Sequence, residues 1–272
     1  MDFDEAVTFL ARKLPESPSV FIIYTNALGN FPVALESLVK FSCDEIPHFP
    51  SKKEGQVPIH LLCGKVLGVQ VMVLQGRYHH YEGYTPEEIM FPVKVAKCLG
   101  CKRMLATNAA GTLSNRFELG DVMLMKSHVD LSGLTDKLEK FLIYGKRELE
   151  RNAKMYNDGF LRMARKLATE EGMDKYVKTG VYGLIGDWIP NNYSEICNWK
   201  KLGIDAVGTS LTPEVLTALE LGMEVFCFSI LTDKGILDYN QYPDPLLEDI
   251  SKAVDPKKAF VKKLLLRFIN TP

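Results

Sequence analysis

The sequence predicts an α/β fold in which helices flank a central β-sheet. Along the 272 residues, short apolar runs rich in β-branched side chains alternate with segments of helical periodicity, which is typical of this fold class. No Pro- or Gly-rich linker and no internal repeat divides the chain. We therefore expect residues 1–272 to form a single domain.

Seven apolar runs are predicted to be strands, at residues 19–25, 69–76, 102–110, 121–129, 177–186, 204–210 and 223–231. A helix is expected to open at Thr85-Pro86-Glu87-Glu88, because this stretch combines an N-cap, a proline at the first helical position and a capping-box glutamate. Residues 212–222 repeat that opening and close at Gly222, a glycine C-cap. The C-terminal segment 256–269 is amphipathic and is expected to pack on the sheet through Phe260, Leu264, Leu265 and Phe268.

Composition excludes several classes of function. A net charge of −1 gives no sign of nucleic-acid binding, and no apolar run reaches the roughly 18 residues of a membrane span. The acidic N-terminal segment 1–14 is unlike a signal or transit peptide. The six cysteines lie mostly in apolar stretches and are expected to be reduced, which places the protein in the cytoplasm. The pair Cys98–Cys101 is expected to be structural, because it follows a helix C-terminus, where a thiolate is not stabilised.

Polar and small residues gather where the predicted strands end. In open α/β sheets ligands bind outside the carboxyl ends of the strands. Backbone N–H groups, hydroxyls and an arginine at such ends are typical of a phosphate site. These strand ends are residues 25–29, 77–81, 107–111, 208–210 and 232–234. Taken singly, each could be a surface salt bridge, a cap or a tight turn.

Other ligand motifs are missing from the sequence. There is neither a Walker A loop nor a G-x-G-x-x-G motif, so we expect neither a nucleoside triphosphate nor NAD as ligand. The consecutive His79 and His80 cannot easily share one metal, and no Cys/His set has zinc spacing. We therefore expect no metal site.

Four segments together closely resemble the trimeric purine nucleoside phosphorylases: "LQGRYHHYEGYTPEEIMFPVKVAKCLG" (74–100), "TNAAGTLSNRFELGDVMLMKSHVDLSG" (107–133), "LGIDAVGTSLTPEVLTALELGMEVF" (202–226) and "SILTDKGILDY" (229–239). The resemblance implies one α/β domain around a mixed, distorted, barrel-like sheet flanked by helices. It also implies a homotrimer that cleaves purine ribonucleosides with inorganic phosphate, giving ribose 1-phosphate and free base. Phosphate would be the co-substrate, and no metal or organic cofactor would be needed.

Carried over by position, the resemblance assigns residues to phosphate and to nucleoside. Phosphate would be bound by Arg77, His79, the backbone N–H of Ala109 and the hydroxyl of Ser210, with Asn26 in place of the family's phosphate-binding serine. Glu82 would orient Arg77. The ribose and base would contact Tyr81, Tyr182 and Thr209.

The chain departs from the family pattern mainly at the purine. In the members that cleave inosine and guanosine, a glutamate binds N1 and an asparagine faces O6 and N7. That glutamate belongs to a Pro-Ser-Phe-Glu-Thr segment of the family. Here, by alignment, Pro190 and Asn191 replace its phenylalanine and glutamate as residues that would bind the substrate, and Asp233 replaces the asparagine. A carboxylate accepts hydrogen bonds and so suits the 6-amino group of adenine; when protonated it also donates to N7. Asp233 is therefore the expected catalytic acid, and adenosine the expected substrate.

Two other interpretations stay open. The chain could be an inosine/guanosine phosphorylase that reaches N1 through another residue. It could also be a catalytically inactive, nucleoside-binding paralogue, since base-reading residues are lost. The sequence leaves open the preferred sugar, the acceptance of 5′-methylthio groups, and which aromatic of a neighbouring subunit closes the pocket, with Phe141 and Tyr144 as candidates.

Overall fold

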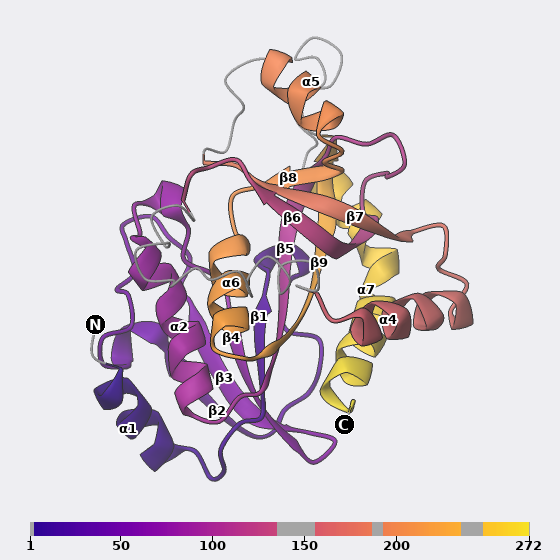
Figure 1. The fold of residues 1–272 in the computed structure, drawn as a ribbon. Coiled ribbons are helices and arrows are strands. Elements are labelled where there is room, and N and C mark those ends of the chain that lie inside the picture. Colours follow the sequence, from indigo (N-terminus) through magenta and orange to yellow (C-terminus); the bar gives the residue numbers. More distant parts are fainter. Residues whose placement is uncertain (1–2, 135–155, 187–192, 235–246, 272) are drawn as a thin grey trace.

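A single continuous sheet organises the chain, seen in the computed structural model of Figure 1. The structure describes residues 3–134, 156–186, 193–234 and 247–271. The strands are β1 (Val20–Tyr24), β2 (Glu36–Ser42), β3 (His60–Val66), β4 (Val69–Gln75), β5 (Arg103–Thr112), β6 (Val122–Asp130), β7 (Val177–Leu184), β8 (Ala206–Gly208) and β9 (Glu224–Lys234). The α-helices are α1 (Asp4–Lys13), α2 (Pro86–Cys98), α4 (Asp158–Glu170), α5 (Tyr193–Lys201), α6 (Thr212–Glu220) and α7 (Leu247–Ile269).

Five of the strands close into a ring. The sheet order is β2-β3-β4-β1-β5-β8-β7-β6-β9, and β9 also pairs with β5. Around this ring β5–β8 and β6–β9 are antiparallel, whereas β8–β7, β7–β6 and β9–β5 are parallel. The predicted fold class, a mixed barrel-like sheet flanked by helices, is confirmed.

The remaining strands extend the sheet from β5. Strand β1 lies between β4 and β5 and is parallel to both, and β5 is parallel to β9. The carboxyl ends of these four strands therefore meet at one edge of the sheet. All five residues of β1 are buried, as expected for a central parallel strand covered on both faces.

Helices cover this sheet in two groups. Helix α2 packs against α6, and α4 packs against α7, which also contacts β9 (Figure 1). The amphipathic C-terminus behaves as predicted, because Phe260, Leu264, Leu265 and Phe268 are all buried. No helix in the described part of the chain is both long and apolar enough to cross a membrane.

All seven predicted strands are present, and two further strands, β2 and β3, were not predicted. Strand β3 forms a hairpin with β4 through Leu67 and Gly68, both of which have positive φ (50° and 81°). Two-residue hairpin turns usually carry Asn-Gly or Asp-Gly. Because Leu67 stands at the first of these positions, the sequence lacked the usual signal for this hairpin. Strand β2 lies at the end of the sheet order and is largely exposed, and it therefore lacks the apolar run that marks the central strands.

Helix starts were predicted with mixed success. The Thr85 cap of α2 is confirmed, since its hydroxyl accepts from the N–H of Glu88 and the Glu88 carboxylate accepts from the N–H of Thr85. The analogous expectation for α6 is wrong. Thr212 is the first helical residue there, and the N-cap is Leu211, which provides no side-chain cap and has φ 81° and ψ −43°.

Candidate active site

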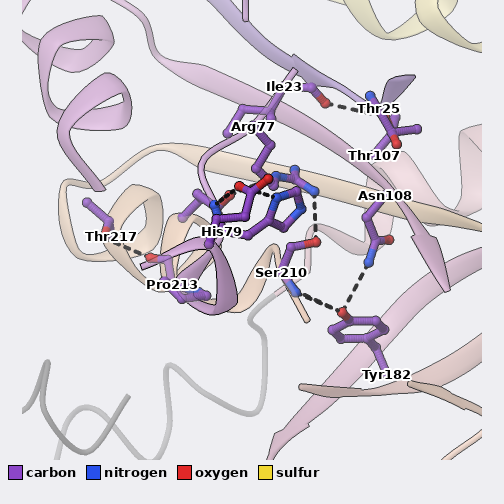
Figure 2. A network of polar contacts seen from close by, with 12 residues as sticks. Ile23, Thr25, Arg77, His79, Thr107, Asn108, Tyr182, Ser210, Pro213 and Thr217 are labelled. Atoms are coloured by element: carbon purple, nitrogen blue, oxygen red, sulfur yellow. Dashed lines mark hydrogen bonds and ion pairs between the residues drawn. The ribbon is translucent and has the colours of Figure 1, made fainter. Parts of the chain in front are cut away.

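Polar residues from three strands meet near the carboxyl ends of β4 and β5. Arg77 follows β4, Asn108 and Ala109 lie on β5, and Ser210 follows β8, whose antiparallel pairing with β5 brings its end back toward Ala109. Figure 2 shows Arg77, His79 and Ser210 side by side, although they are far apart in the sequence. The three side chains assigned to phosphate from the sequence are thus brought together, and their binding of phosphate stays a prediction.

Arg77 is held by two partners from the segment around the start of α6. Its Nη1 donates to Ser210 Oγ at 3.0 Å. Its Nε lies 2.9 Å from Glu214 Oε1, an ion pair whose side chains are only 6% and 3% exposed. The expectation that Glu82 orients Arg77 is wrong, because the ion-pair partner of Arg77 is Glu214, whereas the Glu82 carboxylate contacts His79.

Glu82 instead orients His79. One carboxylate oxygen, Oε2, accepts from the backbone N–H of His79 at 3.1 Å and lies 3.0 Å from its ring Nδ1. Burial raises the pKa of Glu82, but the hydrogen bonds and charge of His79 outweigh that effect and hold the pKa below its ordinary value. The ionised carboxylate only accepts, so Nδ1 carries the proton and Nε2 is the nitrogen that can meet a ligand.

Tyr81 stacks on the histidine. The two ring centroids are 4.9 Å apart, and the rings are inclined by 29°. The tyrosine is 43% exposed, unlike the buried Arg77. Burial, followed by the charge of Glu82, raises the Tyr81 pKa against the opposing effect of Arg77, so the phenol stays neutral at physiological pH. A partly exposed aromatic ring beside His79 is suited to packing against a sugar.

A buried tyrosine supports the turn that carries Ser210. Tyr182 on β7 accepts from Asn108 Nδ2 (3.1 Å) and donates to the carbonyl of Ser210 (3.0 Å), and the N–H of Ser210 lies 3.4 Å from the same hydroxyl (Figure 2). Gly208 permits this approach, because a Cβ there would lie 2.6 Å from the Tyr182 hydroxyl. The contact of Tyr182 with the nucleoside stays a prediction, as does that of the buried Thr209.

Asp233 lies near the end of β9, against the backbone of β5. A bulge in the β5–β9 pairing leaves Thr232 as the extra residue, so that Ala110 pairs with Leu231 and Gly111 with Asp233. A Cβ on Gly111 would lie 2.2 Å from Asp233 Oδ1, so only glycine lets the carboxylate lie there. Thr232 Oγ1 also donates to Asp233 Oδ2 at 3.3 Å.

For the remaining predicted residues the structure gives at most a position in the fold. Ala109 is half-buried on β5 opposite Ile230. Asn26 lies in the short 3₁₀ turn η1 (Asn26–Leu28), directly after β1. Pro190, Asn191, Phe141 and Tyr144 lie outside the described residues. Among the described residues, no group of three His, Cys, Asp or Glu side chains is placed to hold a metal ion.

Glu214 was missed from the sequence, and Asn108 was included only as part of the polar strand end 107–111. A glutamate in the first turn of a helix is an ordinary feature, so nothing marked Glu214 as the partner of an arginine 137 positions earlier. Asn108 lies on a predicted strand, and its side-chain direction follows from the register with β9, where Ser229 Oγ donates to its Oδ1 at 2.7 Å.

Comparison with known proteins gives the same family throughout. The model of the phosphorylase superfamily matches residues 27–270. Purine nucleoside phosphorylase 1 of Bacillus subtilis is 32% identical over 268 residues, covering 95% of this chain and 94% of the relative. The crystal structure of Schistosoma mansoni purine nucleoside phosphorylase in complex with adenosine has a TM-score of 0.84 and 27% identity, covering 98% of this chain and 96% of that one. The structure of the same enzyme with inosine has a TM-score of 0.83 and 26% identity, covering 98% and 95%.

The family match spans nearly the whole sequence, and the structural likeness covers 98% of this chain. This chain belongs to the phosphorylase superfamily, and its relatives within that superfamily are purine nucleoside phosphorylases.

Proposed function

We propose that this protein cleaves purine ribonucleosides with phosphate, giving free base and ribose 1-phosphate, and that it prefers 6-aminopurines such as adenosine. Family membership and the set Arg77, His79 and Ser210 support the phosphorolysis. The observation that carries the base preference is Asp233, whose carboxylate is fitted against Gly111 of β5, two residues after Ala109.

The proposed reaction follows from how charge moves. An oxygen of phosphate forms a bond to C1′ of the ribose while the bond from C1′ to N9 of the purine breaks. The ribosyl group becomes positively charged in the transition state, and an anionic phosphate beneath it stabilises that charge. The electron pair of the broken bond leaves with the purine, which takes up a proton at N7.

Asp233 is the proposed donor of that proton. A positioned acid of this kind typically contributes about 10²–10⁴-fold to the rate. The other oxygen of the Asp233 carboxyl group accepts from the 6-amino group of adenine and repels a 6-oxo oxygen. A site built for one hydrogen-bond pattern rejects the other base, because buried polar groups would be left unpaired.

Two competing functions make different predictions. The Schistosoma enzyme has structures with both adenosine and inosine, so likeness to it supports an inosine/guanosine phosphorylase equally well. An inactive nucleoside-binding paralogue would not need the buried Arg77–Ser210 contact, which serves an anion better than a nucleoside.

The deciding experiment measures phosphate-dependent release of base from adenosine, inosine and 5′-methylthioadenosine, side by side. We expect adenine release from adenosine to exceed hypoxanthine release from inosine. Asp233→Asn should lower adenosine turnover by about 10²-fold or more and narrow that preference. Asp174→Asn, at an exposed aspartate between α4 and β7, controls for the loss of one negative charge.

Each outcome selects one function. Hypoxanthine release as fast as adenine release would refute the base preference. No release from any nucleoside would favour the inactive paralogue. A paralogue that does not bind phosphate would also show no rise in melting temperature when phosphate is added, because only a ligand of the native state stabilises it.

Three further properties belong to the same proposal. The reaction as written needs inorganic phosphate and no metal or organic cofactor, which assays in EDTA would test. The family resemblance supports a homotrimer, to be measured by light scattering. All six cysteines are free, as expected of a protein that works in the reducing cytoplasm.

A further inference from the structure

The ion pair between Arg77 and Glu214 is the most deeply buried pair of opposite charges that the structure describes. Helix α6 supplies the glutamate from its first turn, four residues after Ser210. Between them lies Leu211, a buried residue with φ 81°, a conformation that is costly for any residue with a side chain. The chain is therefore turned sharply so that Ser210 and Glu214 both reach Arg77.

The contacts divide the guanidinium group of Arg77. Nη1 donates to Ser210 Oγ, and Nε faces Glu214 Oε1 at 2.9 Å without the alignment of a hydrogen bond. Nη2 is buried and makes no hydrogen bond to the described residues. Protein contacts therefore fix Nη1 and Nε of Arg77. The N–H groups of Nη2 are left to donate to a ligand, in a direction that these contacts determine.

The same contacts set the direction of the Ser210 proton. Because Ser210 Oγ accepts from Arg77, its own hydrogen points away from the guanidinium. An anion on that side would receive one bond from the serine and others from Nη2. A charge-assisted hydrogen bond of this type depends strongly on its geometry.

We propose that Glu214 is a positioning residue for phosphate: it holds Arg77 so that Nη2 and the Ser210 hydroxyl converge on one anion. The inference rests on the phosphorolysis proposed above and adds the residue that orients its main phosphate ligand. Glu214 itself touches neither substrate.

The charge of Glu214 makes the proposal sharply testable. If the carboxylate only neutralised Arg77, its removal would leave more positive charge and phosphate would bind more tightly. If the carboxylate positions Arg77, its removal would let the guanidinium rotate and phosphate would bind more weakly. The two roles predict opposite signs.

Steady-state kinetics of Glu214→Gln provide the test, with phosphate and nucleoside varied separately. The glutamine has the size of the glutamate but no charge. We expect the KM for phosphate to rise about tenfold or more, the scale of a lost charge-assisted hydrogen bond, while the KM for nucleoside changes by less than about twofold. Glu220→Gln, at the exposed last residue of α6, removes the same charge from the same helix and should leave both values unchanged.

Glu214→Asp is the second variant, which serves also if the glutamine variant fails to fold. It keeps the charge and withdraws the carboxylate by one methylene group, so positioning predicts a raised KM for phosphate here too. A lowered or unchanged KM for phosphate in the folded variants, or an equal rise of both KM values, would overturn the proposal.

The outcome is separable from that of the proposed function. If the unaltered protein releases no base with phosphate, phosphorolysis itself is refuted. If it does release base and the Glu214 variants bind phosphate normally, only the role of Glu214 fails.

Discussion

At the scale of single residues, the candidate site depends on two glycines that admit polar groups. Gly208 lets the Tyr182 hydroxyl reach the Ser210 turn, and Gly111 lets the Asp233 carboxylate lie against β5. In both cases a Cβ would overlap an oxygen atom of a neighbouring strand. The absence of a side chain at Gly208 and Gly111 therefore leaves the space that the Tyr182 hydroxyl and the Asp233 carboxylate occupy.

Gly111→Ala is expected to displace the Asp233 carboxylate. The new Cβ would lie 2.2 Å from Oδ1, far inside van der Waals contact, so the carboxylate must move. If Asp233 is the acid, adenosine turnover should fall by about 10²-fold, because a misplaced acid loses most of its effect. Turnover is measured with purified, folded variant at saturating phosphate.

Gly172→Ala is the matched control. This glycine lies between α4 and β7 with φ 66°, and an added Cβ would meet nothing within 4 Å. The alanine costs about 1 kcal/mol of stability through backbone strain, with activity retained. Normal adenosine turnover in Gly111→Ala would contradict a catalytic role for Asp233 at its present position.

At the scale of elements, polar residues on three strands support the turn between β8 and α6. Ser229 on β9 donates to Asn108 on β5, which donates to Tyr182 on β7, which in turn donates to the Ser210 carbonyl. All four residues are buried. This chain of hydrogen bonds connects the strand that carries Asp233 with the turn that carries Ser210.

Tyr182→Phe should weaken phosphate binding through that turn. Removing the hydroxyl leaves the Ser210 carbonyl and the Asn108 amide with lost partners, at a cost of about 1–3 kcal/mol in stability. Because the Ser210 turn loses a support, the KM for phosphate should rise as well. Tyr156→Phe is the control, since Tyr156 is likewise buried and hydrogen-bonded, to His128, but lies outside this chain of contacts. Equal effects of the two variants on the KM for phosphate would contradict a specific role for Tyr182.

The strands, helices and turns differ in how well they could be predicted from the sequence. The central strands and the Thr85 cap were predictable because burial and capping leave local patterns. The β3–β4 turn was not, because Leu67 adopts a positive φ that its residue type does not indicate. The strand ends located Arg77, His79 and Ser210, whereas Glu214 reaches Arg77 only through the packing of α6 beside the end of β4.

At the scale of the whole molecule, a half-buried histidine should make stability depend on pH. Burial lowers the pKa of His128 on β6 from 6.5 to about 4, against the opposing charge of Asp130. The unfolded chain therefore binds a proton between about pH 6.5 and pH 4 that the folded protein does not, so stability falls as the pH falls through this window. The loss is of the order of 3 kcal/mol when complete, and it is absent above the unfolded pKa.

His128→Asn separates this effect from the titration of other groups. The asparagine side chain can still meet the Tyr156 hydroxyl, which lies 3.0 Å from His128 Nδ1, but it takes up no proton. Denaturant unfolding at pH 7, 6 and 5 should therefore show a shallower loss of stability in the variant than in the unaltered protein. Identical slopes would mean that His128 charges as readily in the folded state as in the unfolded one, and that the pocket around Tyr156 admits water.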